Sequence, residues 1–239
     1  MIASFFHTFL YVPIYNLLVF LVGIIPGGDI GLAVVAATLI VKLVLMPLSL
    51  SAVRTQRRMK SIEKELKELR EKHKKDKEAQ AREMLALYRA HGIRPFSSML
   101  GILIQLPIVL ALYFVFSRQA ILNIDPSLLY GFVDVPAQVA PLFLNLFTVT
   151  GNSLPLALLA AVAQLAHARL SISVPEKSTD TTPSIGKDFG RAMAIQARFV
   201  LPLVVGGIAY FTSGAVALYF ITSSIVGLLQ EGIVRATKD

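Results

Sequence analysis

Apolar residues along the chain fall into long segments separated by shorter polar stretches. Five of these segments follow residue 29, at about 30–53, 95–117, 154–170, 195–211 and 214–231. Most are close to the length of about 20 apolar residues with which a helix crosses a bilayer. The pattern therefore predicts an all-α fold, a polytopic bundle with five core transmembrane helices.

A further apolar segment, residues 5–25, precedes these five. It is interrupted by polar side chains such as His7 and Asn16, and its aromatic residues suit a helix lying flat in the membrane interface. Its length also permits a span. We accordingly expect an N-terminal interfacial or spanning segment, residues 1–29, followed by a core, residues 30–235.

A hydrophilic stretch, about residues 56–92, separates the first two core segments. Its apolar residues recur at helical spacing in two clusters, and pairs such as Glu63 and Lys67 lie four positions apart, which stabilises a helix. His91 and Gly92 are typical of a helix end. The stretch is expected to form a hairpin of two amphipathic helices.

Composition agrees with a membrane protein. Hydrophobic residues make up 55% of the 239 residues and charged residues only 16%, whereas an ordinary soluble domain carries about 25% charged residues. A disordered chain is excluded by this hydrophobicity, and a soluble core of this size could not bury so much apolar surface. Cysteine is absent, which excludes disulfides, thiolate metal sites and a cysteine nucleophile.

The net charge of +8 is concentrated in one place, since residues 51–95 carry fourteen Lys and Arg against seven Asp and Glu. Basic loops remain on the cytoplasmic side of a membrane, so the hairpin, residues 169–198 and the C-terminus are all expected there. The hairpin could be a solvated face, or it could bind anionic lipid headgroups, ribosomal RNA or an incoming polypeptide. The basic residues assigned to it are Arg57, Arg58, Lys60, Lys64, Lys67 and Arg70.

The sequence offers little for catalysis. It contains no zinc-protease, serine-hydrolase or nucleotide-binding motif, and its four histidines show no ligand spacing. The apolar segments hold no Asp or Glu before Glu231, so no carboxylate pair or proton relay lies within them. We expect no enzymatic activity, no cofactor and no metal site.

The informative residues are polar groups within or bordering the apolar segments, because such groups usually face a bundle interior or a wet cavity. Lys42 lies near the middle of residues 30–53, in apolar segments that hold no Asp or Glu before Glu231, whereas Arg54 is more simply explained as a helix-end arginine that reaches lipid phosphates. Gln105 and Gln164 fit either interhelical hydrogen bonds or a polar groove. The set predicted to line a hydrophilic groove is Lys42, Ser51, Arg54, Gln105, Gln164 and Ser223.

Several short motifs occur in order between residues 30 and 235. They are Val41-Lys42-Leu43, Met46-Pro47-Leu48, Met84-Leu85-Ala86-Leu87-Tyr88, Pro95 with Gln105 ten residues later, Ser213-Gly214, Leu218-Tyr219 and Gln230. In this order and spacing they resemble the YidC-type membrane protein insertases, which share a superfamily with insertases of mitochondria and chloroplasts. The chain departs from that family in having Lys42 where arginine is usual. We expect a compact member, without the long extracytoplasmic domain of some bacterial members and without a long basic C-terminal tail.

The resemblance implies a five-helix bundle with a hydrophilic groove that is open to the cytoplasm and to lipid and closed on the outside. It places the groove cation at Lys42 and makes Tyr219 the contact along which the apolar part of a substrate slides into lipid. It implies insertion without nucleotide hydrolysis. The location implied is the bacterial plasma (inner) membrane, with many passes and a cytoplasmic C-terminus.

The partners implied are nascent membrane proteins and the lipid bilayer, with the ribosome and a Sec-type translocon as further candidates. No DNA and no small-molecule substrate is expected. Two other functions stay open from the residues alone, a small channel or transporter and a structural anchor with a tethering basic loop. The lack of acidic residues in the spans and of internal repeats disfavours the channel or transporter.

Overall fold

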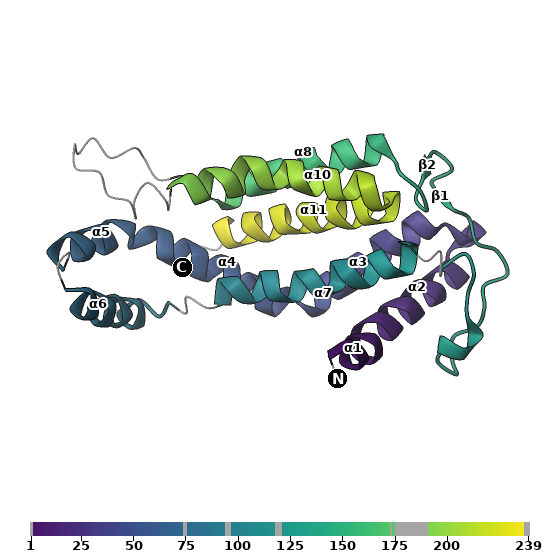
Figure 1. Ribbon diagram of the computed structural model, residues 1–239, viewed down its shortest axis with the longest axis horizontal. Coiled ribbons are helices and arrows are strands. Elements are labelled where there is room, and N and C mark those ends of the chain that lie inside the picture. Colours follow the sequence, from purple (N-terminus) through teal and green to yellow (C-terminus); the bar gives the residue numbers. More distant parts are fainter. Residues whose placement is uncertain are drawn as a thin grey trace. The chain divides into compact units, whose positions relative to one another are not determined.

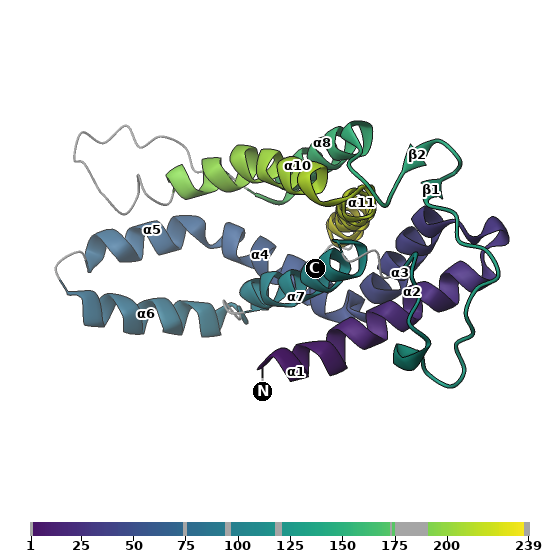
Figure 2. The same ribbon diagram turned by 45° about the vertical axis from the view of Figure 1, so that its right-hand side comes forward.

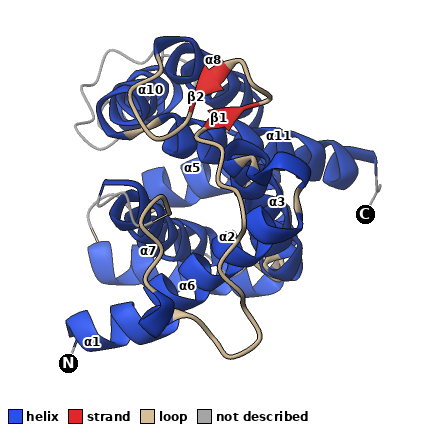
Figure 3. Ribbon diagram, turned by 90° about the vertical axis from the view of Figure 1, so that its right-hand side faces the viewer, coloured by secondary structure: helices blue, strands red, loops and turns tan. Residues whose placement is uncertain are grey.

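The computed structural model describes residues 2–73, 76–93, 97–117, 121–172, 174 and 191–236, with the backbone alone described at residues 2, 3, 70, 97–105 and 117. The described chain is almost entirely helical, with one short pair of strands (Figure 3). This confirms the predicted all-α class. The chain forms two compact units, the first made of Met1–Val44 and Leu106–Leu229, the second of Leu45–Gln105 and Gln230–Asp239.

The first unit begins with a long apolar helix that packs against the next one. The helix is built from α1 (Ile2–Phe6), the π-helical turn η1 (His7–Tyr11) and α2 (Val12–Ile24). A short 3-10 turn, η2 (Pro26–Gly28), leads into α3 (Ile30–Val44), and α2 lies beside α3 (Figure 2). Buried apolar side chains of α2 and α3 form a core that excludes water.

The connection between α7 (Ser97–Ser117) and α8 (Leu154–Ser171) folds over the turn between α2 and α3. It carries the 3-10 turn η3 (Pro126–Leu128) and the antiparallel strands β1 (Leu142–Phe143) and β2 (Phe147–Thr148). The carboxylate of Asp29 accepts hydrogen bonds from the backbone N–H groups of Leu32, at 2.8 Å, and Leu144, at 2.7 Å. Asp29 thus caps the first turn of α3 and holds the strand pair against it.

The same connection is held by two polar residues of α2. The hydroxyl of Tyr15 accepts from the backbone N–H of Asp125 at 2.9 Å. The side-chain amide of Asn16 accepts from the N–H of Tyr130 at 2.7 Å and donates to the carbonyl of Leu128 at 2.8 Å. Asn16 is buried, so the polar residue that interrupts the apolar segment in the sequence satisfies the backbone of a loop far along the chain.

Three further helices complete the first unit. Helix α8 lies beside the helix formed by the π-helical turn η4 (Gln196–Val200) and α10 (Leu201–Thr212) (Figure 1). Helix α11 (Gly214–Ala236) follows, and its residues up to Leu229 belong to this unit. Most of the predicted polar linker, residues 171–190, lies outside the described residues.

The second unit contains α4 (Met46–Ser61), α5 (Glu63–Lys72) and α6 (Lys77–Ala90). Helices α5 and α6 lie side by side and form the helical hairpin that the periodicity predicts (Figure 2). Its small core is made of Ile62, Leu66 and Ile93. Helix α6 ends at Ala90 and is followed by Gly92, which has a φ of 62°, and the N–H of Ile93 donates to the carbonyl of Tyr88 at 2.8 Å.

The predicted continuous helix over residues 30–53 is divided in the structure. Helix α3 ends at Val44 and α4 begins at Met46, with Pro47 in its first turn. A proline fits the first turn of a helix but cannot donate a hydrogen bond to the preceding turn, so it marks a new helix here.

Within the part of the chain that the structure describes, four helices are long and apolar enough to cross a membrane by length and composition, and the bent pair α3 and α4 would make a fifth. The four are Ser4–Ile24, Leu154–Ser171, Arg191–Thr212 and Gly214–Ala236. This agrees with the predicted polytopic bundle. Within α7, the part with described side chains contributes a shorter apolar helix, Leu106–Phe116.

Candidate functional site

Lys42 lies in the last turn of α3, with its side chain partly buried. The sequence predicts a position near the middle of one long span. Because that span is divided at Leu45, Lys42 lies at the end of a helix instead. The C-terminal end of a helix carries partial negative charge, which stabilises a cation there. Lys42 therefore combines a charge within an apolar helix with a favourable local backbone environment.

Helices α8 and α11 carry several polar side chains within the first unit, and we call them the α8–α11 polar cluster. The hydroxyl of Ser224 donates a hydrogen bond to the side-chain oxygen of Gln164 at 2.8 Å, and Ser224 is almost fully buried. This bond joins two apolar helices through groups that would be costly in lipid. The members of the cluster are Gln164, His167, Tyr219, Ser223 and Ser224.

The hydroxyl groups of Tyr219 and Ser223 are buried, one helical turn apart on α11. They lie near each other, but neither makes a hydrogen bond of good geometry with a described residue. Tyr219 is only 2% exposed, and its role as a sliding contact for a substrate stays a prediction. Ile225 and Leu229 are the large apolar side chains that α11 exposes within the first unit.

His167 packs directly against α11 at Gly227. A Cβ atom placed on Gly227 would lie 2.6 Å from the ring nitrogen Nε2 of His167, closer than any real contact. The glycine therefore lets the imidazole approach the helix backbone. The sequence shows His167 only as one of four histidines without ligand spacing.

Ser51 and Arg54, the two residues of α4 that the sequence predicts for the groove, both have exposed side chains. The neighbouring Ser49 instead accepts a hydrogen bond from the side-chain amide of Gln230 at 2.9 Å. This bond joins α4 to the C-terminal part of α11 within the second unit. The side chain of Gln105 lies outside the described residues, although its backbone belongs to α7.

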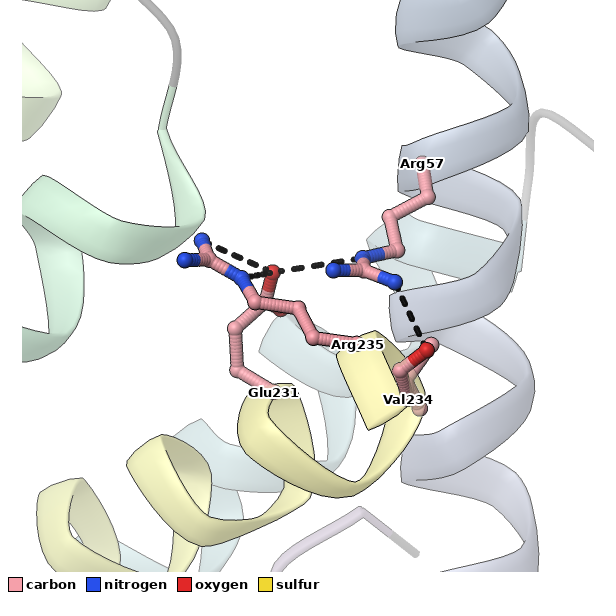
Figure 4. A network of polar contacts seen from close by, with 4 residues as sticks. All are labelled: Arg57, Glu231, Val234 and Arg235. Atoms are coloured by element: carbon pink, nitrogen blue, oxygen red, sulfur yellow. Dashed lines mark hydrogen bonds and ion pairs between the residues drawn. The ribbon is translucent and has the colours of Figure 1, made fainter. Parts of the chain in front are cut away.

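Arg57 joins α4 to the last turns of α11 (Figure 4). Its Nε lies 3.5 Å from a carboxylate oxygen of Glu231, and its Nη1 donates to the carbonyl of Val234 at 2.6 Å. Arg235 approaches the same carboxylate oxygen at 3.4 Å. Since the Glu231 side chain is only 7% exposed, these two arginines neutralise a buried charge and Arg57 also satisfies a helix-end carbonyl. We call this arrangement the C-terminal clamp.

The rest of the basic hairpin is arranged as a solvent-facing surface. Arg58, Lys60, Lys64 and Lys67 all have exposed side chains on α4 and α5, and the side chain of Arg70 lies outside the described residues. Arg57 differs from them because it is engaged in the clamp. Among the described residues, no three His, Asp or Glu side chains come together as metal ligands would.

A family model described as 60Kd inner membrane protein matches residues 21–239. The match includes every helix from α3 onward. The chain belongs to the 60Kd inner membrane protein family. This membership confirms the resemblance drawn from the ordered motifs.

Individual relatives of the 60Kd inner membrane protein family carry the name "Membrane protein insertase YidC". One from Oceanobacillus iheyensis is 27% identical over 233 residues, covering 96% of this chain and 83% of the relative. One from Fusobacterium nucleatum is 26% identical over 204 residues, covering 85% of each chain. One from Clostridium tetani is 36% identical over 93 residues, covering 39% of this chain and 42% of the relative.

Two features of this family member were not found from its sequence. The partner of Arg57 was missed, although Glu231 ends a long charge-free stretch and Arg235 follows four positions later, which together mark an ion pair at a helix end. The capping role of Asp29 was also missed. An Asp immediately before an apolar helical run is the signal that could have found it.

Proposed function

We propose that this chain is a membrane protein insertase that inserts and helps fold nascent membrane proteins. The observation that carries the proposal is its membership of the 60Kd inner membrane protein family, with full-length relatives named as YidC insertases. Candidate spans with few charged residues support a multi-pass protein of the bacterial inner membrane.

The proposed mechanism relies on a hydrophilic groove that offers a charge and hydrogen-bonding groups inside the membrane. Lys42 compensates acidic or polar parts of an incoming segment for a short time, and Gln164 and Ser223 solvate its backbone. The burial of Ser223 and the bond between Gln164 and Ser224 support a polar interior for α8 and α11. Gln105, Ser51 and Arg54 stay predictions for the same groove.

The energy for insertion comes from the substrate. Moving roughly 20 apolar residues from water into lipid releases enough free energy to drive the step, so no nucleotide is required. The absence of a nucleotide-binding motif in the sequence is consistent with this. The apolar part of the substrate enters lipid along α11, where Tyr219 stays the predicted sliding contact and Ile225 and Leu229 are the exposed apolar side chains.

The C-terminus and the basic hairpin are assigned to the cytoplasmic side by the distribution of Lys and Arg. Nascent membrane proteins and the lipid bilayer are the partners of the proposed function. The exposed cations Arg58, Lys60, Lys64 and Lys67 provide a surface for anionic headgroups or for the ribosome, and a Sec-type translocon is a further candidate partner.

The test is reconstitution of the purified chain into liposomes with a small membrane protein that has an acidic translocated tail. An insertase transfers the tail into the lumen, where it is protected from added protease, without flux of small solutes. Solute flux without insertion would instead support the channel or transporter.

A further inference from the structure

Two arginines of the first unit lie against one aromatic ring. Arg169 is in the last turn of α8 and Arg198 is in the π-helical turn η4. The guanidinium carbon of each lies 5.8 Å from the centroid of the Phe199 ring. The two guanidinium groups are therefore no farther apart than twice that distance, and their like charges repel each other.

The described residues provide no counter-charge for this pair, because none of their carboxylates forms an ion pair with Arg169 or Arg198. The Nε of Arg198 and the Nη1 of Arg191, in the same helix, are both buried without a hydrogen-bond partner among these residues. Buried N–H donors cost free energy when they lack an acceptor. π-helical turns such as η4 also occur frequently at functional sites.

The two arginines lie at a similar depth in adjacent helices. Arg169 lies fifteen positions after Leu154, and Arg198 lies fourteen positions before Thr212. At 1.5 Å per residue, each arginine is about 21–23 Å from the opposite end of its helix, short of a hydrocarbon core of about 30 Å. The side chains of Phe199, Val200 and Leu170 around them are exposed and apolar, as a surface facing acyl chains would be.

We propose that Arg169 and Arg198, on either side of Phe199, bind the phosphate group of an anionic phospholipid. A guanidinium group donates paired hydrogen bonds that match phosphate oxygens, and it tolerates an apolar environment better than an ammonium group does. The charge pattern places this end of α8 at the cytoplasmic leaflet, where anionic lipids are attracted to basic side chains. The exposed apolar side chains favour a lipid over an RNA backbone, which has no acyl chain to cover them.

The experiment is native mass spectrometry of the full chain in detergent with equal amounts of dioleoyl phosphatidylglycerol and dioleoyl phosphatidylcholine. The native protein is expected to retain phosphatidylglycerol preferentially. R169Q/R198Q is expected to lower that retention by about tenfold, because each cation near the membrane surface strengthens the binding of an anionic lipid several-fold. The matched control R82Q/R89Q removes the same two charges from α6 and is expected to keep the preference.

Further measurements distinguish a phospholipid headgroup from a soluble phosphate and from RNA as the ligand. Glycerol 3-phosphate or inorganic phosphate at millimolar concentration is expected to leave bound phosphatidylglycerol in place, and its displacement by either would overturn the lipid assignment in favour of a soluble phosphate ligand. A loss of oligouridylate binding in R169Q/R198Q, without loss of lipid, would assign the site to RNA instead. If the double variant does not fold, R169Q and R198Q alone should each lose retention about threefold, and full retention in either would overturn the two-arginine site.

Discussion

Single residues of the α8–α11 polar cluster hold polar atoms inside an apolar surrounding. The hydrogen bond between Ser224 and Gln164 crosses between two helices that are themselves largely apolar. Gly227 allows His167 to pack on the same helix one turn further on. At Ser224 a hydrogen bond and at Gly227 the space beside His167 restrict which side chain fits. Small substitutions there should therefore change the free energy of unfolding measurably.

Ser224→Ala removes the donor of that hydrogen bond and leaves the side-chain oxygen of Gln164 without it. We expect the free energy of unfolding in detergent to fall by about 1 kcal/mol, which is typical of interhelical hydrogen bonds in membranes. Chemical or thermal unfolding would measure the change. Ser51→Ala, at an exposed position of α4, is the matched control and should have no effect; an equal loss in both variants would argue against this bond as the cause.

Asp125 is an exposed residue outside the membrane spans whose pKa lies below its usual value of 3.8. The cause is hydrogen bonding to the ionised carboxylate, first by the hydroxyl of Ser127, at 2.7 Å, and then by its backbone N–H, at 2.9 Å. Because the folded pKa is lowered, the stabilisation is present above the unfolded pKa and is lost as the pH falls through the folded pKa.

Ser127→Ala is therefore expected to raise the pKa of Asp125 toward 3.8, because it removes the larger of the two hydrogen bonds. An NMR titration of the Asp125 side-chain carbon measures the midpoint in both proteins. An identical midpoint in the two would show that the Ser127 hydroxyl does not hold the carboxylate.

At the scale of elements, the C-terminal clamp fixes the end of α11 to α4. Glu231 is buried and shared by Arg57 and Arg235, and Gln230 reaches Ser49 one residue earlier. The clamp therefore stabilises the last two turns of the helix through side chains rather than apolar packing alone.

Arg57→Gln leaves Glu231 with Arg235 alone and removes the donor to the Val234 carbonyl. We expect a loss of about 2 kcal/mol, less than for a fully buried pair because the Arg57 side chain is 35% exposed. Hydrogen exchange of the amides of residues 230–236 should become faster, while exchange in α8 stays unchanged.

A control for the clamp is Arg58→Gln, which removes the same charge from the next, exposed position of α4. It should leave the exchange of residues 230–236 unaltered. In the double variant R57Q/E231Q the loss should be smaller than the sum of the single losses, since the two side chains interact. Additive losses would contradict a direct ion pair.

At the scale of the whole chain, hydrophobic segments and charge distribution were enough to predict an all-α polytopic protein and its helical hairpin. Segment length could not reveal the break at Leu45, because the residues on both sides of it, up to Val53, are mostly apolar and Pro47 fits the start of a helix as well as the interior of a kinked one. Because of this break, Lys42 lies at the end of α3 in the structure, whereas the sequence predicts a position near the middle of a span.

The candidate site was predictable in its polar residues but not in their partners. The polar character of Gln164, Ser223 and Ser224 within apolar segments could be read directly, whereas the pairing of Ser224 with Gln164 joins residues 60 positions apart. The burial of Tyr219 and the use of Arg57 in the clamp depend likewise on how distant helices pack. Periodicity within one helix carries no information on such contacts.

The central claim is that this chain is an insertase in which Lys42 compensates acidic groups of its substrates. The most direct test measures insertion into liposomes of a small membrane protein with an acidic translocated tail, beside the same substrate with a neutral tail. Lys42→Ala is expected to lower insertion of the acidic substrate by about tenfold, or about 1.4 kcal/mol, and to affect the neutral one little, whereas Lys42→Arg keeps most of the activity. Full activity of Lys42→Ala with both substrates would contradict the account.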